Sequence, residues 1–283
     1  MKYLPCFLML IFSIFSFSQE DPKQQVDVLF IGNSLTYYHD MPLQVQQMLN
    51  ETHPHFKIAQ STFPGMQLSG HLDQIIVSQT ENSISTFPKV EGEVTQTEKV
   101  ILQQDWDIII MQTGGVGLLI PENRKDVVNE AIEKVKILAT NPNCKFVIFN
   151  TWPHKNTYPK QYCHSAYPGP PEQGKKNCSP VLHSLEDELA VLNKAYQSTA
   201  SETGIARTDH GSKFYTVIKN HPDIELYEDT YHPNENGAFL NACVFYTFLT
   251  GSDATQLKFT GNIHPETAAV LKEVSRQEER LFD

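Results

Sequence analysis

A short apolar run that ends in Gly32-Asn33-Ser34 is the sequence feature that most constrains the fold. The run Val26 to Ile31 is apolar apart from Asp27, which is typical of a buried strand. A helical pattern then begins near Pro42. A turn between a parallel strand and a helix lies at the carboxyl edge of the sheet, where open α/β folds bind their ligands. We therefore take Ser34 as the candidate nucleophile.

The rest of the chain alternates between strand and helix patterns. Further strands are predicted over residues 56–61, 107–111, 145–149 and 205–207. Helices are predicted over residues 43–50, 68–77, 121–138, 182–203 and 234–249, and residues 78–93 are predicted to form an irregular surface excursion. This alternation is typical of βαβ units around a parallel sheet. We expect one such α/β domain over residues 19–283.

Composition excludes several classes of partner. The chain is 40% hydrophobic and 19% charged, which predicts a globular protein with a substantial core. Its formal charge of −11 argues against binding to nucleic acid or to anionic membrane surfaces, since both need clustered Lys and Arg. The sequence has no His-Glu-x-x-His, Cys-x-x-Cys or Walker motif, so we expect neither a metal nor another cofactor.

The first 18 residues have the form of a secretory signal peptide. Lys2 precedes an apolar run from Phe7 to Phe17, and small Ser residues follow before Gln19. The run is too short to span a bilayer comfortably, which argues against stable membrane insertion, although a retained N-terminal anchor is the alternative. We expect a secreted or periplasmic protein.

Residues 153–182 form an expected insertion that interrupts the alternation. The segment is rich in Pro and cannot be a helix or a central strand. It contains Cys163 and Cys178, which we predict to be bonded because disulfides persist in exported proteins; a free pair is the alternative. Cys144 and Cys243 lie in apolar surroundings and are predicted to be buried thiols.

A carboxylate and a histidine lie three residues apart just before the last predicted helix. Asp229 can turn back to accept the Nδ1–H of His232, which leaves Nε2 free to take a hydroxyl proton. The alternative is a helix-entry loop in which both residues are incidental. With Ser34, the pair completes the residue types of a Ser-His-Asp triad.

These two motifs together resemble those of the SGNH (GDSL-type) hydrolases. The block Gly32-Asn33-Ser34-Leu35 matches the nucleophile block of that family in its Asn variant, and Asp-x-x-His matches its last block. The resemblance extends from Val26 to Leu249. It implies a three-layer α/β/α flavodoxin-like fold with a parallel sheet, and a catalytic triad of Ser34, Asp229 and His232. It also implies that the N–H groups of Ser34 and Gly65 line an oxyanion hole.

One block departs from the family pattern. The third block usually reads Gly-x-Asn-Asp, and its Asn donates to the oxyanion, whereas this chain has Gln112-Thr113-Gly114-Gly115. The chain is similar to a bacterial SGNH branch with Gln in this block. We therefore expect Gln112 to be the third oxyanion donor, the alternative being that its amide only satisfies backbone groups.

The resemblance implies a secreted ester hydrolase that removes O-acetyl groups from a carbohydrate, with a small-molecule or polysaccharide ester as substrate. Trp152 and His154 follow the fourth predicted strand and are expected to contact the sugar, although tryptophan also packs in cores. Two alternatives are a lipase or phospholipid esterase of the same fold and a non-catalytic carbohydrate-binding protein.

Overall fold

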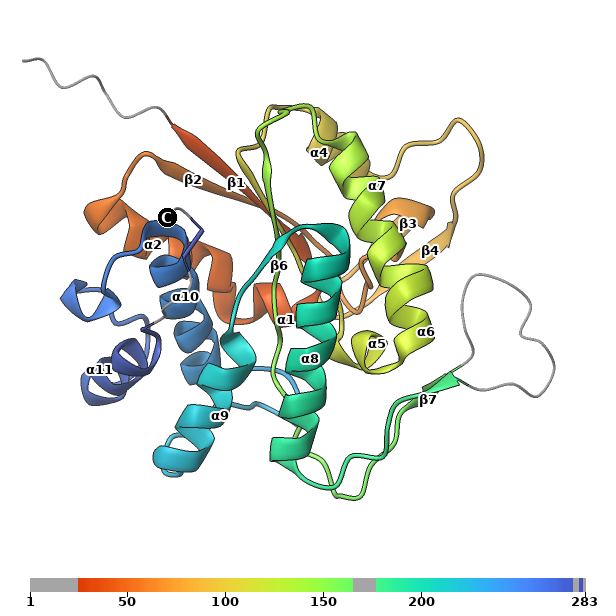
Figure 1. Cartoon of the computed structure of the whole chain (residues 1–283). Coiled ribbons are helices and arrows are strands. Elements are labelled where there is room, and N and C mark those ends of the chain that lie inside the picture. The colour runs from red at the N-terminus through yellow and green to blue at the C-terminus, as the bar shows by residue number, and fades with distance from the viewer. Residues whose placement is uncertain (1–24, 165–176, 277–279, 282–283) are drawn as a thin grey trace, which may run out of the picture.

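A five-stranded parallel sheet lies between two layers of helices in the computed structural model, which describes residues 25–164, 177–276 and 280–281 (Figure 1). The strand order is β2-β1-β5-β6-β9, the order of flavodoxin-like folds. The strands are β1 (Val26–Gly32), β2 (Phe56–Thr62), β5 (Ile108–Met111), β6 (Lys145–Ile148) and β9 (Ala206–Arg207). The predicted three-layer α/β/α fold with a parallel sheet is confirmed.

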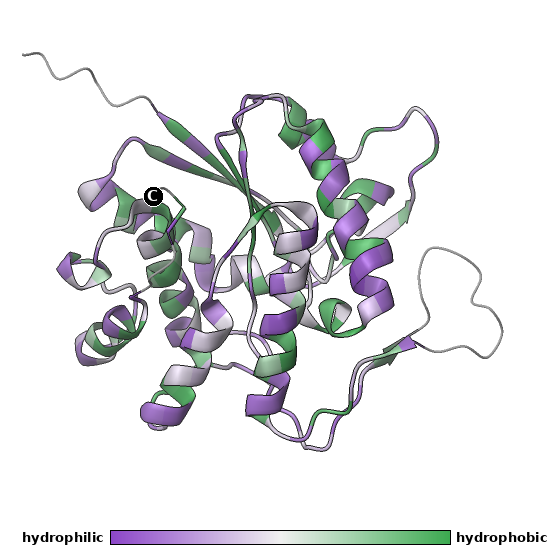
Figure 2. Cartoon of the chain, viewed as in Figure 1, coloured by the Kyte–Doolittle hydropathy of each residue, from purple (hydrophilic) through white to green (hydrophobic). Residues whose placement is uncertain are grey.

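Strand β1 is buried on both faces of the sheet. It pairs with β2 on one side and with β5 on the other. Val28 and Phe30 point into one core, and Leu29 and Ile31 point into the other, all with no exposed surface. The central strands are accordingly mostly hydrophobic (Figure 2). Two-sided burial explains why this segment is a continuous apolar run rather than an alternating one.

The helices divide between the two faces (Figure 1). One layer contains α2 (Met41–Thr52), α9 (His210–Asn220), α10 (Glu235–Thr250) and α11 (Pro265–Val274). The other contains α4 (Gln96–Leu102), α7 (Glu130–Leu138) and α8 (Leu185–Thr203). Helix α10 packs against β1 through the edge-to-face contact of Phe245 with Phe30, whose ring centroids are 4.9 Å apart.

The helix predicted over residues 68–77 is wrong for most of its length. Only α3 (Gly70–Asp73) is helical, and the chain continues as β3 (Gln74–Gln79). This strand pairs antiparallel with β4 (Ile84–Pro88), within a segment predicted to be irregular. Consecutive β-branched residues in β3 favour an extended backbone, and a neighbouring strand supplies the pairing that a periodicity argument cannot see.

The predicted helix over residues 121–138 is present but is not uniformly α-helical. It comprises α6 (Pro121–Asn123), the π-helical segment η2 (Arg124–Asn129) and α7. Helices α4, α9 and α11 were not predicted from the sequence. Helix α4 had a readable signal, because Thr95 and Glu98 form a capping box at its start.

The insertion carries a small two-stranded sheet outside the main sheet. Strand β7 (Cys163–His164) pairs with β8 (Asn177–Cys178), and a disulfide joins Cys163 to Cys178, which confirms the predicted bond. Figure 1 shows this arm extending away from the body of the molecule. Cys144 and Cys243 are free thiols, the first half-buried and the second fully buried.

The predicted signal peptide lies outside the described residues. Within the described ranges, every helix is too short or too polar to cross a membrane.

Two histidines are buried in the neutral form. His71 donates from Nε2 to the Gly32 carbonyl, so its Nδ1 accepts from the Thr97 hydroxyl. Burial lowers the pKa of His71 to about 4, and the bond to Gly32 offsets this only in part. Burial likewise lowers the pKa of His210 to about 3. Protonating either side chain would bury an uncompensated charge.

Because His71 and His210 are buried in the neutral form, we expect the folded protein to lose stability in acid. Both native pKa values lie below the ordinary value of 6.5, so the unfolded chain binds more protons than the folded chain between about pH 6.5 and 4. The free energy of unfolding should therefore fall as the pH is lowered through this window, by up to about 1.4 kcal/mol per pH unit for each histidine. Urea denaturation at several pH values measures this slope.

The variant His71→Gln isolates one contribution, since glutamine offers a donor and an acceptor but does not titrate. Its slope should be shallower than that of the wild type by about one proton. The exposed His264 provides the control, because His264→Gln should leave the slope unchanged. Equal slopes for all three proteins would contradict the assignment.

Candidate active site

The turn after β1 is held in place by the side chain of Asn33. Its Oδ1 accepts from the Leu35 amide at 3.1 Å and caps the short helix α1 (Ser34–Tyr37). Its Nδ2 donates to the Met66 carbonyl at 3.0 Å, which ties the turn to the loop after β2. Ser34 therefore lies at the start of helix α1, on a turn that is bonded to the loop after β2.

Gln112 lies beneath this turn rather than beside the candidate nucleophile. Its Oε1 accepts from the Asn33 amide at 2.8 Å and from the Thr36 hydroxyl at 3.0 Å. A Cβ atom on Gly32 would lie 2.4 Å from Thr36 Oγ1 and 2.6 Å from Gln112 Oε1. Only glycine therefore fits at position 32, because any side chain there would displace both contacts.

The expected role of Gln112 as an oxyanion donor is not supported by this position. The side chain is fully buried and does not line the cavity beside Ser34. Its Nε2 is buried without a hydrogen-bond partner among the described residues, while its oxygen satisfies a backbone amide. The alternative interpretation, in which Gln112 serves the backbone, matches the geometry.

Ser34, His232 and Asp229 form a continuous chain of hydrogen bonds. Ser34 Oγ lies 2.9 Å from His232 Nε2, and His232 Nδ1 lies 2.7 Å from Asp229 Oδ2. The carboxylate can only accept, so Nδ1 carries the ring proton and Nε2 accepts from the serine hydroxyl. This is the protonation state in which an imidazole can act as general base.

The Asp229 carboxylate is fixed by its own loop. Oδ1 accepts from the backbone amides of Tyr231 and His232, both at 2.8 Å. Burial alone would raise the pKa of Asp229, but the bonds from the Tyr231 amide, the His232 ring and the His232 amide outweigh it and lower the pKa. The carboxylate is therefore ionised at neutral pH.

Two tyrosine rings contact the imidazole of His232. The ring of Tyr38 is parallel to it, at a centroid distance of 4.4 Å and an interplanar angle of 3°. The ring of Tyr231 lies 4.0 Å away at 37°. A hydrogen bond between His39 Nε2 and Glu228 Oε2, at 2.9 Å, joins the segment after α1 to the loop that carries Asp229. The imidazole is thus held by stacking as well as by hydrogen bonds.

Trp152 belongs to the core rather than to the cavity, contrary to the expected sugar contact. Its ring is 1% exposed and stacks on Phe214 with centroids 4.0 Å apart. A ring buried in this way has no free face for a sugar. Its Nε1–H donates to the Tyr231 carbonyl at 2.9 Å, so Trp152 instead anchors the loop between Asp229 and His232.

His154 lines the cavity, and its segment is supported by the buried carboxylate of Glu188. Glu188 accepts from the His154 amide at 3.0 Å, from Asn156 Nδ2 at 3.0 Å and from the Tyr158 hydroxyl at 2.9 Å. Burial lowers the pKa of His154, although the Glu188 charge opposes this. Glu188 was not predicted from the sequence, because nothing in the pattern of α8 distinguishes it from a surface residue.

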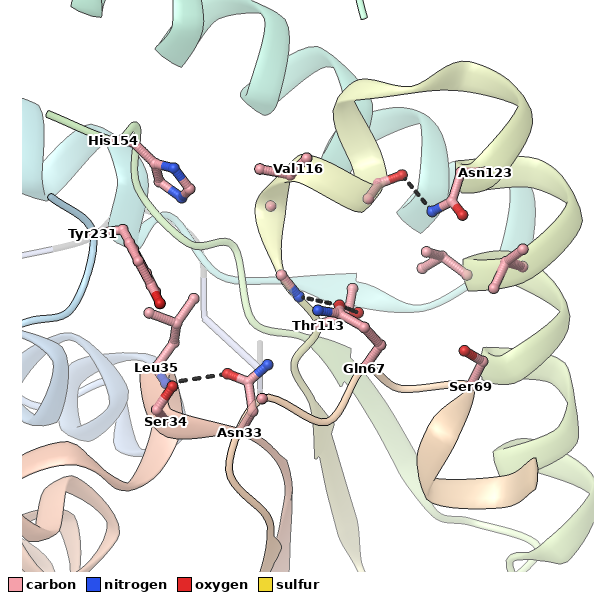
Figure 3. Close-up of a pocket in the computed structure, with 16 residues that line it drawn as sticks. Asn33, Ser34, Leu35, Gln67, Ser69, Thr113, Val116, Asn123, His154 and Tyr231 are labelled. Carbon is pink, nitrogen blue, oxygen red and sulfur yellow. Dashed lines mark hydrogen bonds between the residues drawn. The ribbon is translucent and has the colours of Figure 1, made fainter. Parts of the chain in front are cut away.

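A cavity of about 610 Å³ opens beside Ser34. Figure 3 shows Ser34, Tyr231 and His154 on one side, Asn123 and Ser69 on the other, and Gln67 and Thr113 between them. Gly65 lies in its lining with a φ of +64°, in the turn after β2. The lining also includes Gly114, Gly115, Val116, Gly117, Val127 and Val128. Among the described residues, the insertion contributes only His154 to this lining.

No protein-family model and no curated protein matches the sequence. Solved structures share the fold. A DUF4886 family protein from Bacteroides uniformis has a TM-score of 0.62 and 14% identity, over 89% of this chain and 93% of that chain. LAE5, an alpha/beta hydrolase enzyme from the metagenome of Lake Arreo, has a TM-score of 0.50 and 11% identity, over 78% and 94%. At these identities the likeness shows the fold alone.

A third structure has a slightly lower TM-score than these two. It is an acetylxylan esterase from Geobacillus stearothermophilus, with a TM-score of 0.49 and 13% identity, over 78% of this chain and 93% of that chain.

The position of Gln112 predicts a loss of stability when its oxygen is removed. Gln112→Met keeps the length of the side chain but leaves the buried Asn33 amide without an acceptor. The free energy of unfolding should fall by about 2 kcal/mol. The shift of the urea midpoint at constant m-value measures this loss. The exposed Gln47 provides a matched control, and Gln47→Met should change stability by less than about 0.5 kcal/mol. Equal midpoints would contradict the role assigned to Gln112.

Proposed function

We propose that this protein is a secreted serine ester hydrolase. The observation that carries the proposal is the chain of hydrogen bonds from Ser34 through His232 to Asp229, which opens onto a cavity. The Cys163–Cys178 disulfide supports export, because such bonds persist in oxidising compartments. The resemblance of the two sequence motifs to those of SGNH hydrolases supports the same reaction class.

The geometry supports a two-step acyl transfer. Ser34 Oγ attacks the ester carbonyl carbon while His232 Nε2 takes the hydroxyl proton. His232 then gives this proton to the alcohol oxygen as the bond from the carbonyl carbon to that oxygen breaks, leaving an acyl-enzyme. Water, deprotonated by His232, attacks the acyl group, and Ser34 leaves with its proton restored. Asp229 stabilises the imidazolium that forms in each step.

Two backbone groups are available for the oxyanion. The Ser34 amide is the first of helix α1 and has no intrahelical partner, and the Gly65 amide has no partner among the described residues. Both residues line the cavity. Each such donor typically contributes about 10²–10³ to kcat, because its bond strengthens as negative charge develops.

We propose an O-acetyl group on a carbohydrate as the substrate. The cavity offers hydrogen-bonding side chains suited to hydroxyl groups, among them His154, Ser69 and Asn123, alongside its valines. A lipase would need a long apolar channel, whereas polar side chains recur along this lining. The choice of substrate rests on this mixed lining and on the sequence resemblance.

Replacement of the triad residues tests the proposed reaction. With p-nitrophenyl acetate as substrate, Ser34→Ala and His232→Ala should each lower kcat by about 10⁴ or more. Asp229→Asn should cost less, because the imidazole still reaches Ser34. A Ser34→Ala variant that keeps a tenth of wild-type turnover would show that the nucleophile is another residue.

The choice of acyl group separates the functional alternatives. The wild type should hydrolyse p-nitrophenyl acetate faster than the butyrate and octanoate esters. A preference for octanoate would indicate a lipase, and no hydrolysis of any ester would indicate a binding protein.

The ring of Tyr38 predicts a smaller effect on turnover. An aromatic face stabilises a cation stacked on it by about 0.5–2 kcal/mol, and His232 becomes an imidazolium in each step of the proposed reaction. Tyr38→Leu should therefore lower kcat by about tenfold with little change in KM, whereas Tyr38→Phe should stay within about twofold of the wild type. Steady-state kinetics on p-nitrophenyl acetate measures both.

The neighbouring Tyr37, half-buried and without a ring contact to His232, provides the control for this experiment. Tyr37→Leu should leave kcat within about twofold. Equal losses in the Tyr37 and Tyr38 variants would assign the effect to general packing around α1.

A further inference from the structure

Gln67 places a carboxamide in the wall of the cavity, two residues after Gly65. Its Oε1 accepts from the Thr113 hydroxyl at 2.7 Å and from the Gly114 amide at 2.8 Å. The loop after β2 therefore carries a polar side chain that is held by the loop after β5. Figure 3 shows this carboxamide beside Thr113.

The two partners of Gln67 determine which end of its amide faces the cavity. The Gly114 amide can only donate. The Thr113 hydroxyl already accepts from the Leu68 amide at 3.3 Å and directs its own proton to Gln67. If the carboxamide of Gln67 were flipped, its NH₂ group would face the Gly114 N–H, and two donors would meet without an acceptor. The oxygen must therefore face the β5 loop, and Nε2 is left without a partner among the described residues.

The carboxamide fills space that a side chain on Gly114 would otherwise take. A Cβ atom on Gly114 would lie 3.0 Å from Gln67 Nε2 and 3.1 Å from Gln67 Oε1. Glycine at position 114 thus allows the amide of Gln67 to lie flat against the backbone after β5. The arrangement amounts to a preorganised donor, because the oxygen is fixed and the nitrogen is free.

We propose that Gln67 is the side-chain donor of the oxyanion hole. This inference rests on the proposed ester hydrolysis. Nε2–H would bind the former carbonyl oxygen of the tetrahedral intermediate together with the amides of Ser34 and Gly65, all of which line the same cavity. Gln67 thereby takes the part that the sequence assigned to Gln112, whose own amide is buried beneath the turn.

Two substitutions of Gln67 separate donation from support of the loop. Gln67→Ala should lower kcat on p-nitrophenyl acetate by about 10²–10³ and leave KM within about threefold, because the bond strengthens only in the transition state. Gln67→Glu keeps an oxygen acceptor for Thr113 and Gly114 but presents an anion to the oxyanion. Its kcat should fall at least as far, while its melting temperature stays at the wild-type value.

A rescue experiment tests the location of the donor. Gly114 has φ −61° and ψ 130°, which any residue adopts. In the Gln67→Ala background, Gly114→Asn places a new carboxamide in the vacated space and should raise kcat at least tenfold. Gly114→Ala in the same background is the matched control and should restore nothing.

The outcomes separate this inference from the proposed function. If both Gln67 variants keep kcat within threefold of the wild type while Ser34→Ala is inactive, Gln67 is not a donor and the ester hydrolase assignment stands. If Gln67→Glu loses stability in parallel with activity and Gly114→Asn fails to rescue, Gln67 has only a structural role. If Ser34→Ala stays active, the proposed function fails, and the inference fails with it.

Discussion

The hydrogen bond from the Asn33 amide to the buried Gln112 carboxamide fixes the geometry on which the candidate site depends. It joins the end of β1 to the end of β5 at the point where both strands stop. The missing side chain of Gly32 allows the close approach, and the Thr36 hydroxyl shares the same acceptor. Since an unsatisfied buried amide costs about 1–3 kcal/mol, the turn has little freedom to open. The position of Ser34 follows from this constraint.

Other loops at the same sheet edge are held to one another in a similar way. Asn33 reaches the loop after β2 through the Met66 carbonyl, and Trp152 reaches the loop before α10 through the Tyr231 carbonyl. Each of these contacts joins segments far apart in the sequence. Side chains locked by such bonds need little rearrangement during a reaction, which is the condition for strong electrostatic catalysis.

The sequence predicted those features that depend on local order. The apolar run of β1 and its turn fixed the sheet and the place of Ser34, and the three-residue spacing of Asp229 and His232 allowed their contact to be foreseen. Gln67 was not predicted from the sequence, because its role depends on hydrogen bonds between its side chain and a loop more than forty residues away. A polar residue two positions after Gly65 was its only signal.

The side chains and the segment that the sequence could not place share one physical cause. Gln112 follows a central strand, and the sequence could not tell whether its side chain turns towards the cavity or beneath the neighbouring turn. Trp152 was equally ambiguous, since packing on Phe214 depends on where α9 lies. Strand β3 was read as helix because its pairing with β4 is a tertiary contact. In each case the deciding partner came from another element.

The exposure of Asp229 to solvent affects how this carboxylate can orient the imidazole of His232. The carboxylate side chain is 48% exposed, so bulk water and mobile ions reach it. At physiological ionic strength the Debye length is about 8 Å, and charges in contact with solvent are screened over such distances. Two backbone amides and one ring N–H nevertheless bind this carboxylate at 2.7–2.8 Å. Directional hydrogen bonds of this kind depend on contact rather than on a long-range field, so we expect the ring of His232 to keep its orientation at low and at high ionic strength.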